Sequence, residues 1–157
     1  IQQTRDGEIN KVKQIYNKNK LESEVKDFFD DIYNKFKEAH LIITRSGGSS
    51  VAEILASNRP VIFFPLPFAL DNHQEENARF IVSNGGGWIF NQNNFNQEEF
   101  KNLIQRLILN PKNLNEASNK IRKLSTNLKK IRQNKSSADF FASTILNFIN
   151  LNHKESI

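Results

Sequence analysis

Residues 41–64 read LIITRSGGSSVAEILASNRPVIFF, and this stretch decides the fold class. It begins and ends with short apolar runs, Leu41–Thr44 and Val61–Phe64, whose β-branched and aromatic residues predict buried strands. The segment between the runs has apolar residues at helical spacing, serines at its start, and Asn58 before Arg59-Pro60 as a stop signal. A strand, a helix and a second strand joined by such short connections predict two parallel neighbours in an α/β sheet.

The alternation of strands and helices continues outside this stretch. We predict further strands over residues 24–26 and 87–90, and helices over residues 9–16, 30–39, 72–84, 96–110, 114–131 and 141–149. Aspartates should cap the second of these helices, and Asn96 should begin the fourth, which stops before Pro111. The elements together predict an α/β fold, a Rossmann-like parallel sheet with flanking helices. We assign residues 1–150 to this domain and residues 151–157 to a polar tail.

Apolar spacing predicts which side of several helices faces the core. The inward-facing residues are Val12, Ile15 and Tyr16 on the first helix; Phe100, Leu103, Ile104, Leu107 and Ile108 on the helix from Asn96; Leu114, Ala117, Ile121, Leu124, Leu128 and Ile131 on the next; and Phe141, Ile145, Phe148 and Ile149 on the last.

The composition indicates a folded domain and excludes several kinds of site. Apolar residues make up 38% of the 157 residues, enough for one compact unit with at most the stub of a second. The absence of cysteine excludes disulfides, thiolate zinc sites and cysteine nucleophiles. No stretch reaches the roughly 18 consecutive apolar residues of a membrane-spanning helix. Because the chain lacks methionine and opens on Ile1, we expect upstream residues to be missing from it.

The net charge of +5 is concentrated towards the C-terminus. Ten Lys and Arg residues lie between Lys101 and Lys135, where Glu116 is the only acid. Such a surface suits nucleic acid or anionic lipid, but no aromatic residues accompany it for stacking on bases. We interpret it as the solvated side of helices and expect no nucleic-acid binding.

The loop Arg45–Ser50 is a candidate anion site. It follows the first predicted buried strand and opens a helix, and ligands of parallel sheets bind at the carboxyl ends of the strands. Unpaired N–H groups and the positive end of the helix dipole attract phosphate there, and two glycines let the backbone approach it closely. The alternative is a tight turn with a serine cap. Glu53 is similarly ambiguous, since it completes a capping-box pattern with Ser50 but can also accept hydrogen bonds from ribose hydroxyls.

A second polar cluster follows the next strand, in residues 65–78 (PLPFALDNHQEENA). His73, Gln74 and Asn77 suit a polyhydroxylated ligand because side-chain amides both donate and accept hydrogen bonds. The alternative is that Asp71 or Asn72 merely caps the helix and the amides are solvated. Asp71 and His73 are candidate metal ligands, but two ligands without a third do not make a metal site, so we expect no bound metal.

Residues 45–78, RSGGSSVAEILASNRPVIFFPLPFALDNHQEENA, closely resemble the donor-binding half of the MurG glycosyltransferase family. The family pattern is R-S-G-(A/G)-x-T/S-(V/L)-(A/S)-E, then G-x-P, a strand, P, and a D-(D/x)-(H/Q)-Q-x-x-N-A element. The first residue of G-x-P is Asn58 here, and Asn tolerates the left-handed conformation that Gly supplies. Residues 28–32 (FFDDI) resemble the family's F-I-x-D-M segment, and weaker similarity extends from Ile1 to about Leu109.

The resemblance implies the C-terminal half of a GT-B fold, in which two Rossmann-like domains face each other across a cleft. It also implies roles for individual residues: the backbone at Phe29 would meet uracil, Glu53 the ribose, and Gln74 the transferred sugar. The remaining implied donor contacts, around the diphosphate, are Gly48, Ser49, Ser50, Val51 and Ala52. Further candidate contacts are Arg45, Ser46, His73 and Asn77.

The activity implied by the resemblance is inverting transfer of N-acetylglucosamine from UDP-N-acetylglucosamine to lipid I, undecaprenyl-pyrophosphoryl-N-acetylmuramoyl-pentapeptide. This step makes lipid II in peptidoglycan synthesis, at the cytoplasmic face of the bacterial inner membrane, with no cofactor. A first strand, a G-G-S-Q-G-A loop and the N-terminal domain, which would supply the acceptor face and the catalytic base, are missing from the sequence. We therefore expect this chain to bind the donor but to be inactive alone. The alternatives are the donor-binding subunit of a split glycosyltransferase and a non-catalytic nucleotide-sugar-binding module.

Overall fold

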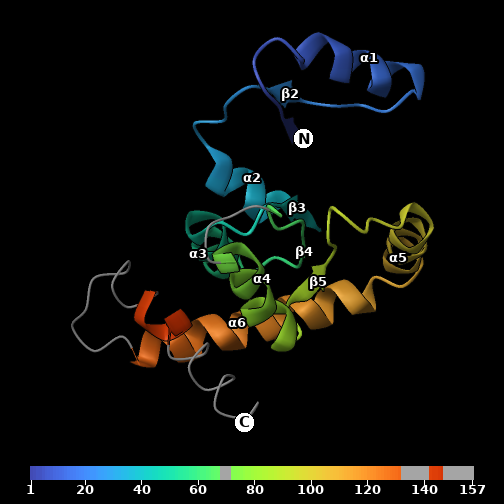
Figure 1. The fold of residues 1–157 in the computed structure, drawn as a ribbon. Coiled ribbons are helices and arrows are strands. Elements are labelled where there is room, and N and C mark those ends of the chain that lie inside the picture. The colour runs from blue at the N-terminus through green and yellow to red at the C-terminus, as the bar shows by residue number, and fades with distance from the viewer. Residues whose placement is uncertain (68–71, 132–141, 147–157) are drawn as a thin grey trace. The chain divides into compact units, whose positions relative to one another are not determined.

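The computed structural model describes residues 1–67, 72–131 and 142–146 (Figure 1). Its internal contacts divide the chain into two compact units, Ile1–Glu38 and Ala39–Ile157. The chain length predicted one unit with at most a stub of a second, which stays a prediction. The assignment of residues 1–150 to a single domain stays a prediction.

The first unit is a small parallel β-α-β arrangement followed by a helix. Its elements are β1 (Gln2–Gln3), α1 (Ile9–Lys18), β2 (Val25–Lys26) and α2 (Ile32–Glu38), and β1 pairs in parallel with β2. Both predicted helices and the predicted strand over 24–26 are confirmed. The predicted aspartate cap is not found, because no side-chain hydrogen bond from Asp30 or Asp31 occurs within the described residues.

Packing in this unit is thin. Val25 and Phe29 are its buried apolar residues, while α1 has none. The prediction that Ile15 faces inward is wrong, since 56% of the residue is exposed. The two-stranded sheet covers only the face of α1 that carries Val12 and Tyr16. It is too narrow to cover Ile15 as well. On the surface, hydrogen bonds from Lys26 and Lys35 lower the pKa of the Glu24 carboxyl.

The second unit contains a three-stranded parallel sheet. Its strands are β3 (Ile42–Thr44), β4 (Val61–Phe63) and β5 (Gly87–Ile89), in the order β3-β4-β5. Ile43 pairs with Ile62, and Ile62 with Trp88. The predicted parallel neighbours and the predicted last strand are thus confirmed. Gly87 permits the close approach of β5 to β4, since a Cβ there would collide with the Val61 carbonyl.

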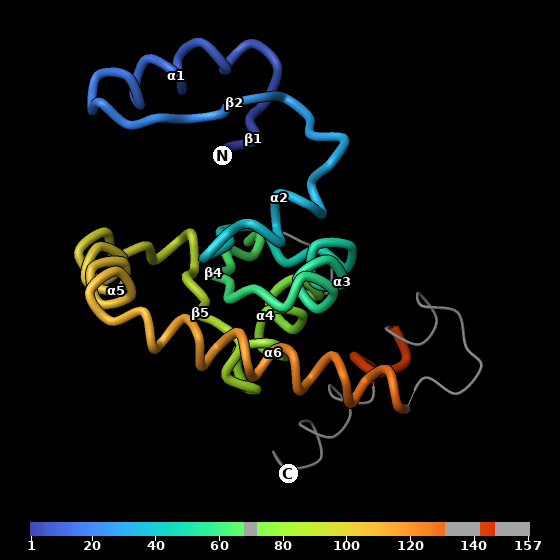
Figure 2. Tube along the Cα trace, turned by 180° about the vertical axis from the view of Figure 1, so that it is seen from behind, coloured from blue at the N-terminus to red at the C-terminus, as the bar shows by residue number. Residues whose placement is uncertain are grey.

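Four helices flank this sheet: α3 (Gly48–Ser57), α4 (His73–Ser83), α5 (Gln97–Leu109) and α6 (Lys112–Ile131). Figures 1 and 2 show α6, in orange, running past α4 with α5 near one end of it. All three residues of the central strand β4 are fully buried. Ile62 packs in one cluster with Leu103 and Leu107 of α5, while α3 packs against both α4 and α6. Asn58 ends α3 at φ 56°, which confirms that it replaces a glycine in a left-handed position.

The two C-terminal helices follow the sequence pattern with one exception. The Asn96 side chain accepts hydrogen bonds from the Glu98 and Glu99 N–H groups and begins α5 as predicted. The prediction that Ile108 is buried is wrong, since it is 69% exposed. The core cluster beneath α5 extends only to the side that carries Leu103 and Leu107, so the predicted apolar stripe is wider than the surface it covers.

In α6, the basic residues are exposed opposite a side on which Ala117, Ile121 and Leu128 are buried, as predicted. Residues 142–146 are helical and include Ile145. The side chains of Ile131, Phe141, Phe148 and Ile149, and the predicted tail over 151–157, lie outside the described residues.

Candidate functional site

The connection between β3 and α3 forms a turn with unpaired backbone donors. We call Gly47–Ser50 the α3 turn. Gly47 occupies the N-cap position in an extended conformation, and its carbonyl accepts the Val51 N–H at 3.0 Å. Within the described residues, the N–H groups of Gly48, Ser49 and Ser50 have no acceptor. Three unpaired donors at the positive end of a ten-residue helix form a cradle for an anion.

The surroundings of the α3 turn are open. A Cβ added at Gly47 or Gly48 would meet no atom within 4 Å. Ser49 and Ala52 are exposed, whereas Val51 is fully buried and contributes its side chain to the core. Of the residues from Gly48 to Ala52 that were predicted to contact the donor, Val51 is therefore the one whose side chain is turned away from solvent.

The capping interpretation of Glu53 is wrong. The helix begins at Gly48, so Ser50 is its third residue and Glu53 its sixth, beyond the first turn where a capping box operates. No side chain caps α3. Glu53 is half-buried, and its carboxylate has no hydrogen bond or ion pair within the described residues. A carboxylate in this state is available to accept hydrogen bonds from a ligand.

Four residues fasten the α3 turn to the neighbouring segments, and we call them the loop clamp: Arg45, Ser46, Gln74 and Asn77. The guanidinium of Arg45 donates to the carbonyl oxygens of Phe64 at 2.9 Å and Pro65 at 3.4 Å. Ser46 is fully buried, and its hydroxyl donates to the Gln74 carbonyl at 2.7 Å. The amide of the buried Asn77 donates to the Ser46 carbonyl at 2.9 Å.

The loop clamp changes the interpretation of three predicted contacts. Arg45, Ser46 and Asn77 were candidate donor contacts, but the structure uses their polar groups to join the ends of β3 and β4 to α4. Their partners lie 19, 28 and 31 residues away in the sequence. Sequence reasoning missed this role because no short-range pattern connects residues so far apart.

Gln74 has one side-chain group engaged and one available. Its Oε1 accepts the Leu66 N–H at 3.0 Å, while its Nε2 has no acceptor within the described residues. His73 is the exposed first residue of α4, next to the left-handed Asn72, whose side chain makes no capping bond. Asp71 lies outside the described residues, among which no three His, Cys, Asp or Glu side chains gather as metal ligands.

Phe29 belongs to the first unit. Its ring is buried, with the Lys26 Nζ atom 5.2 Å from the ring centroid. Its backbone was predicted to meet uracil, and that role stays a prediction.

Comparison with known proteins places this geometry in a family. The chain matches the glycosyltransferase family 28 C-terminal domain over residues 1–139. It is 41% identical over 123 residues to the UDP-N-acetylglucosamine--N-acetylmuramyl-(pentapeptide) pyrophosphoryl-undecaprenol N-acetylglucosamine transferase of Rickettsia felis, covering 78% of this chain and 34% of that protein. The protein of the same name from Wolbachia pipientis subsp. Culex pipiens is 37% identical over 122 residues, covering 78% of this chain and 36% of the relative.

A solved structure agrees with these relatives. The crystal structure of Acinetobacter baumannii MurG matches with a TM-score of 0.71 at 30% identity, covering 77% of this chain and 35% of that one. The chain thus spans about a third of the length of the proteins it matches. The resemblance to the MurG family and the expected fold, an α/β C-terminal half of a GT-B enzyme, are both confirmed. By its sequence match and its fold, this chain belongs to the glycosyltransferase family 28 C-terminal domain family.

Proposed function

We propose that this domain binds UDP-N-acetylglucosamine and supplies the donor half of an inverting transfer of N-acetylglucosamine to lipid I. The observation that carries the proposal is the α3 turn: among the described residues, its three N–H groups have no acceptor, and they lie three to five residues before Glu53, whose carboxylate has no partner there either. The names of the curated relatives support it, since they describe an N-acetylglucosamine transferase that acts on a pyrophosphoryl-undecaprenol acceptor.

Each available group suits one part of the donor. The N–H groups of Gly48, Ser49 and Ser50 suit the diphosphate, and the hydroxyls of both serines can add donors. The Glu53 carboxylate suits the ribose hydroxyls, because an ionised acceptor forms strong hydrogen bonds with them. The free Nε2 of Gln74 suits a hydroxyl of the transferred sugar.

The same turn has a role in the chemical step. Transfer breaks the bond between the anomeric carbon and the diphosphate oxygen, and the acceptor oxygen bonds to that carbon from the opposite face. Negative charge then develops on the departing UDP. N–H groups that are already oriented stabilise this charge in the transition state without having to reorganise.

The acceptor side of the reaction lies outside what this chain offers. We propose that the acceptor site and the base that takes up the proton of the acceptor hydroxyl belong to the part of the relatives that the chain does not match. No helix among the described residues is long and apolar enough to cross a membrane. We propose peripheral association with the cytoplasmic face of the inner membrane, because the acceptor named for the relatives is a pyrophosphoryl-undecaprenol lipid.

Calorimetry on the Glu53→Ala variant tests the proposal. Loss of a hydrogen bond to a charged group costs ~1.5–3 kcal/mol, so UDP should bind roughly 10- to 150-fold more weakly. The melting temperature should not change, because Glu53 caps no helix. Glu99→Ala is the matched control, since it removes an exposed carboxylate from another helix and should leave UDP affinity unchanged.

Two results would count against the donor-binding role. If the unsubstituted chain showed no saturable binding of UDP or UDP-N-acetylglucosamine, the proposal would fail. If UDP bound equally well to the Glu53→Ala variant, the carboxylate would not contact the ribose and the assignment of the α3 turn would need another ligand.

A further inference from the structure

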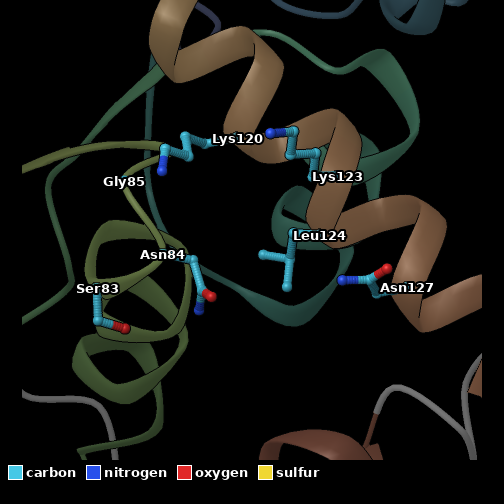
Figure 3. A pocket seen from close by; sticks show the side chains of 7 residues that line it. All are labelled: Ser83, Asn84, Gly85, Lys120, Lys123, Leu124 and Asn127. Atoms are coloured by element: carbon cyan, nitrogen blue, oxygen red, sulfur yellow. The ribbon is translucent and has the colours of Figure 1, made fainter.

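A pocket with a volume of about 400 Å³ lies between the C-terminal end of α4 and the side of α6 (Figure 3). We call it the anion pocket. Its lining residues are Ser83, Asn84, Gly85, Lys120, Lys123, Leu124 and Asn127. α4 begins beside the loop clamp and ends at this pocket, and its eleven residues at about 1.5 Å each separate the two places by roughly 16 Å. The pocket is therefore distinct from the α3 turn.

The lining of the pocket is mostly polar, with Leu124 as its apolar side chain, and its charged residues are both lysines. Lys120, Lys123 and Asn127 are spaced by three and four along α6, so they project from one side of that helix. Within the described residues neither lysine forms an ion pair, in contrast to Lys101 and Lys112, which pair with glutamates. Both lysines therefore line one pocket whose lining contains no carboxylate to neutralise them.

The end of α4 does not need these lysines as hydrogen-bonding caps. Three of its last four carbonyl oxygens already accept hydrogen bonds: Phe80 accepts from the Asn84 side chain at 2.8 Å, Val82 from the Gly85 N–H at 2.9 Å, and Ile81 from the Gly86 N–H at 3.0 Å. The ammonium groups therefore remain available to another partner.

The backbone shape at the pocket positions one of the lysines. Gly85 has φ 76°, and a Cβ there would lie 3.4 Å from Cγ of Lys120, so the lysine stem runs against the glycine. Figure 3 shows Lys120 extending from α6 towards Gly85, with Asn84 and Asn127 on opposite sides below it. The Asn127 amide has no hydrogen-bond partner within the described residues.

We propose that the anion pocket binds a phosphate-bearing ligand. Two ammonium groups match the charge of a phosphate, and side-chain amides can donate to its oxygens or accept from neighbouring hydroxyls. The volume lies at the lower end of the range for small-molecule sites, which suits a phosphate ester rather than a nucleotide sugar. A soluble phosphate ester and a phospholipid headgroup present the same chemistry, and the experiment distinguishes these two sources.

The test is an amide NMR titration of the whole chain with inorganic phosphate, at constant ionic strength maintained with sodium chloride. Saturable shifts are expected at Asn84, Gly85 and Asn127. The double variant K120Q/K123Q should weaken phosphate binding there about tenfold, since hydrogen bonds to charged groups contribute most to such a site. K129Q/K130Q is the matched control, because it removes the same charge from exposed positions of α6 outside the pocket and should change affinity less than about twofold.

Vesicle co-sedimentation identifies the source of the phosphate. Phosphatidylcholine vesicles with and without phosphatidylglycerol are compared for the chain and both double variants. If K120Q/K123Q selectively loses binding to the anionic vesicles, the ligand is a phospholipid headgroup. If inorganic phosphate binds saturably but vesicle binding is unchanged in this variant, the ligand is a soluble phosphate ester.

Three results would overturn the proposal: no saturable shifts at the pocket residues, equal weakening by the two double variants, or shifts confined to the α3 turn. None of these depends on the proposed donor binding, which the Glu53→Ala variant tests separately.

Discussion

The two ends of α4 present different kinds of binding surface. At its start, the α3 turn offers backbone N–H groups whose positions are set by the buried hydrogen bonds of the loop clamp. At its end, the anion pocket offers side chains on the exposed surface of α6. A backbone site is rigid and depends on residues that never touch the ligand. A side-chain site depends on its own charges, which salt screens.

The largest effect is expected from breaking the loop clamp at Asn77. Asn77→Ala leaves the buried Ser46 carbonyl without a donor, which should lower the free energy of unfolding by ~1–3 kcal/mol. UDP affinity should also fall, because the α3 turn keeps only the bond from the Ser46 hydroxyl to the Gln74 carbonyl as its hydrogen bond to α4. Denaturant unfolding and calorimetry measure the two effects.

Asn119→Ala is the control for that experiment, since its exposed side chain accepts a hydrogen bond from the exposed Arg122 and makes no buried hydrogen bond in the described part of the chain. It should change the free energy of unfolding by less than about 0.5 kcal/mol. An Asn77 variant no less stable than this control would mean that the clamp does not hold the turn.

A smaller effect is expected from adding a methyl group to the α3 turn itself. A Cβ at Gly47 meets no protein atom, so a loss of UDP affinity in Gly47→Ala is attributed to contact with the ligand. The change at the N-cap should separately lower the free energy of unfolding by up to ~1 kcal/mol. We expect about tenfold weaker UDP binding, since glycine permits close approach of the backbone to a phosphate.

Gly48→Ala is the matched control for Gly47→Ala. The family pattern allows alanine at this position, and the added Cβ also meets open space. UDP affinity should persist, with stability unchanged or slightly raised by the better helix propensity of alanine. Equal losses in both variants would show that ligand approach does not distinguish the two glycines.

The smallest effect is expected from Gln74→Ala. UDP-N-acetylglucosamine should bind about fivefold more weakly, which corresponds to the ~1 kcal/mol of one neutral hydrogen bond, and UDP should be scarcely affected. The Leu66 N–H also loses its acceptor, but it lies at an exposed position where water can replace the bond. Equal losses for the two ligands, measured by calorimetry, would assign Gln74 to holding the loop rather than the sugar.

The local structure and the family of this chain could both be predicted from its amino-acid sequence. Strand, helix and strand follow from apolar spacing and stop signals within residues 41–64, and both Asn58 and Asn96 sit at the helix ends predicted for them. These features rest on interactions between residues two to four positions apart, which a linear pattern records. The R-S-G and Q-x-x-N-A motifs are each short and continuous in the sequence. Their order along the chain was sufficient to identify the MurG family.

Which polar side chains are available to a ligand could be seen only from the way the segments pack together. Glu53 and Asn77 are both polar residues in predicted site motifs. Among the described residues the Glu53 carboxylate has no partner, whereas the Asn77 amide donates a hydrogen bond to the Ser46 carbonyl. The exposure of Ile15 and Ile108 could not be predicted from the sequence either, because it depends on how wide the surface beneath each helix is. The physical reason is the same in each case: a buried contact requires two segments to meet, and which segments meet is fixed by strand order and helix packing, not by spacing along the chain.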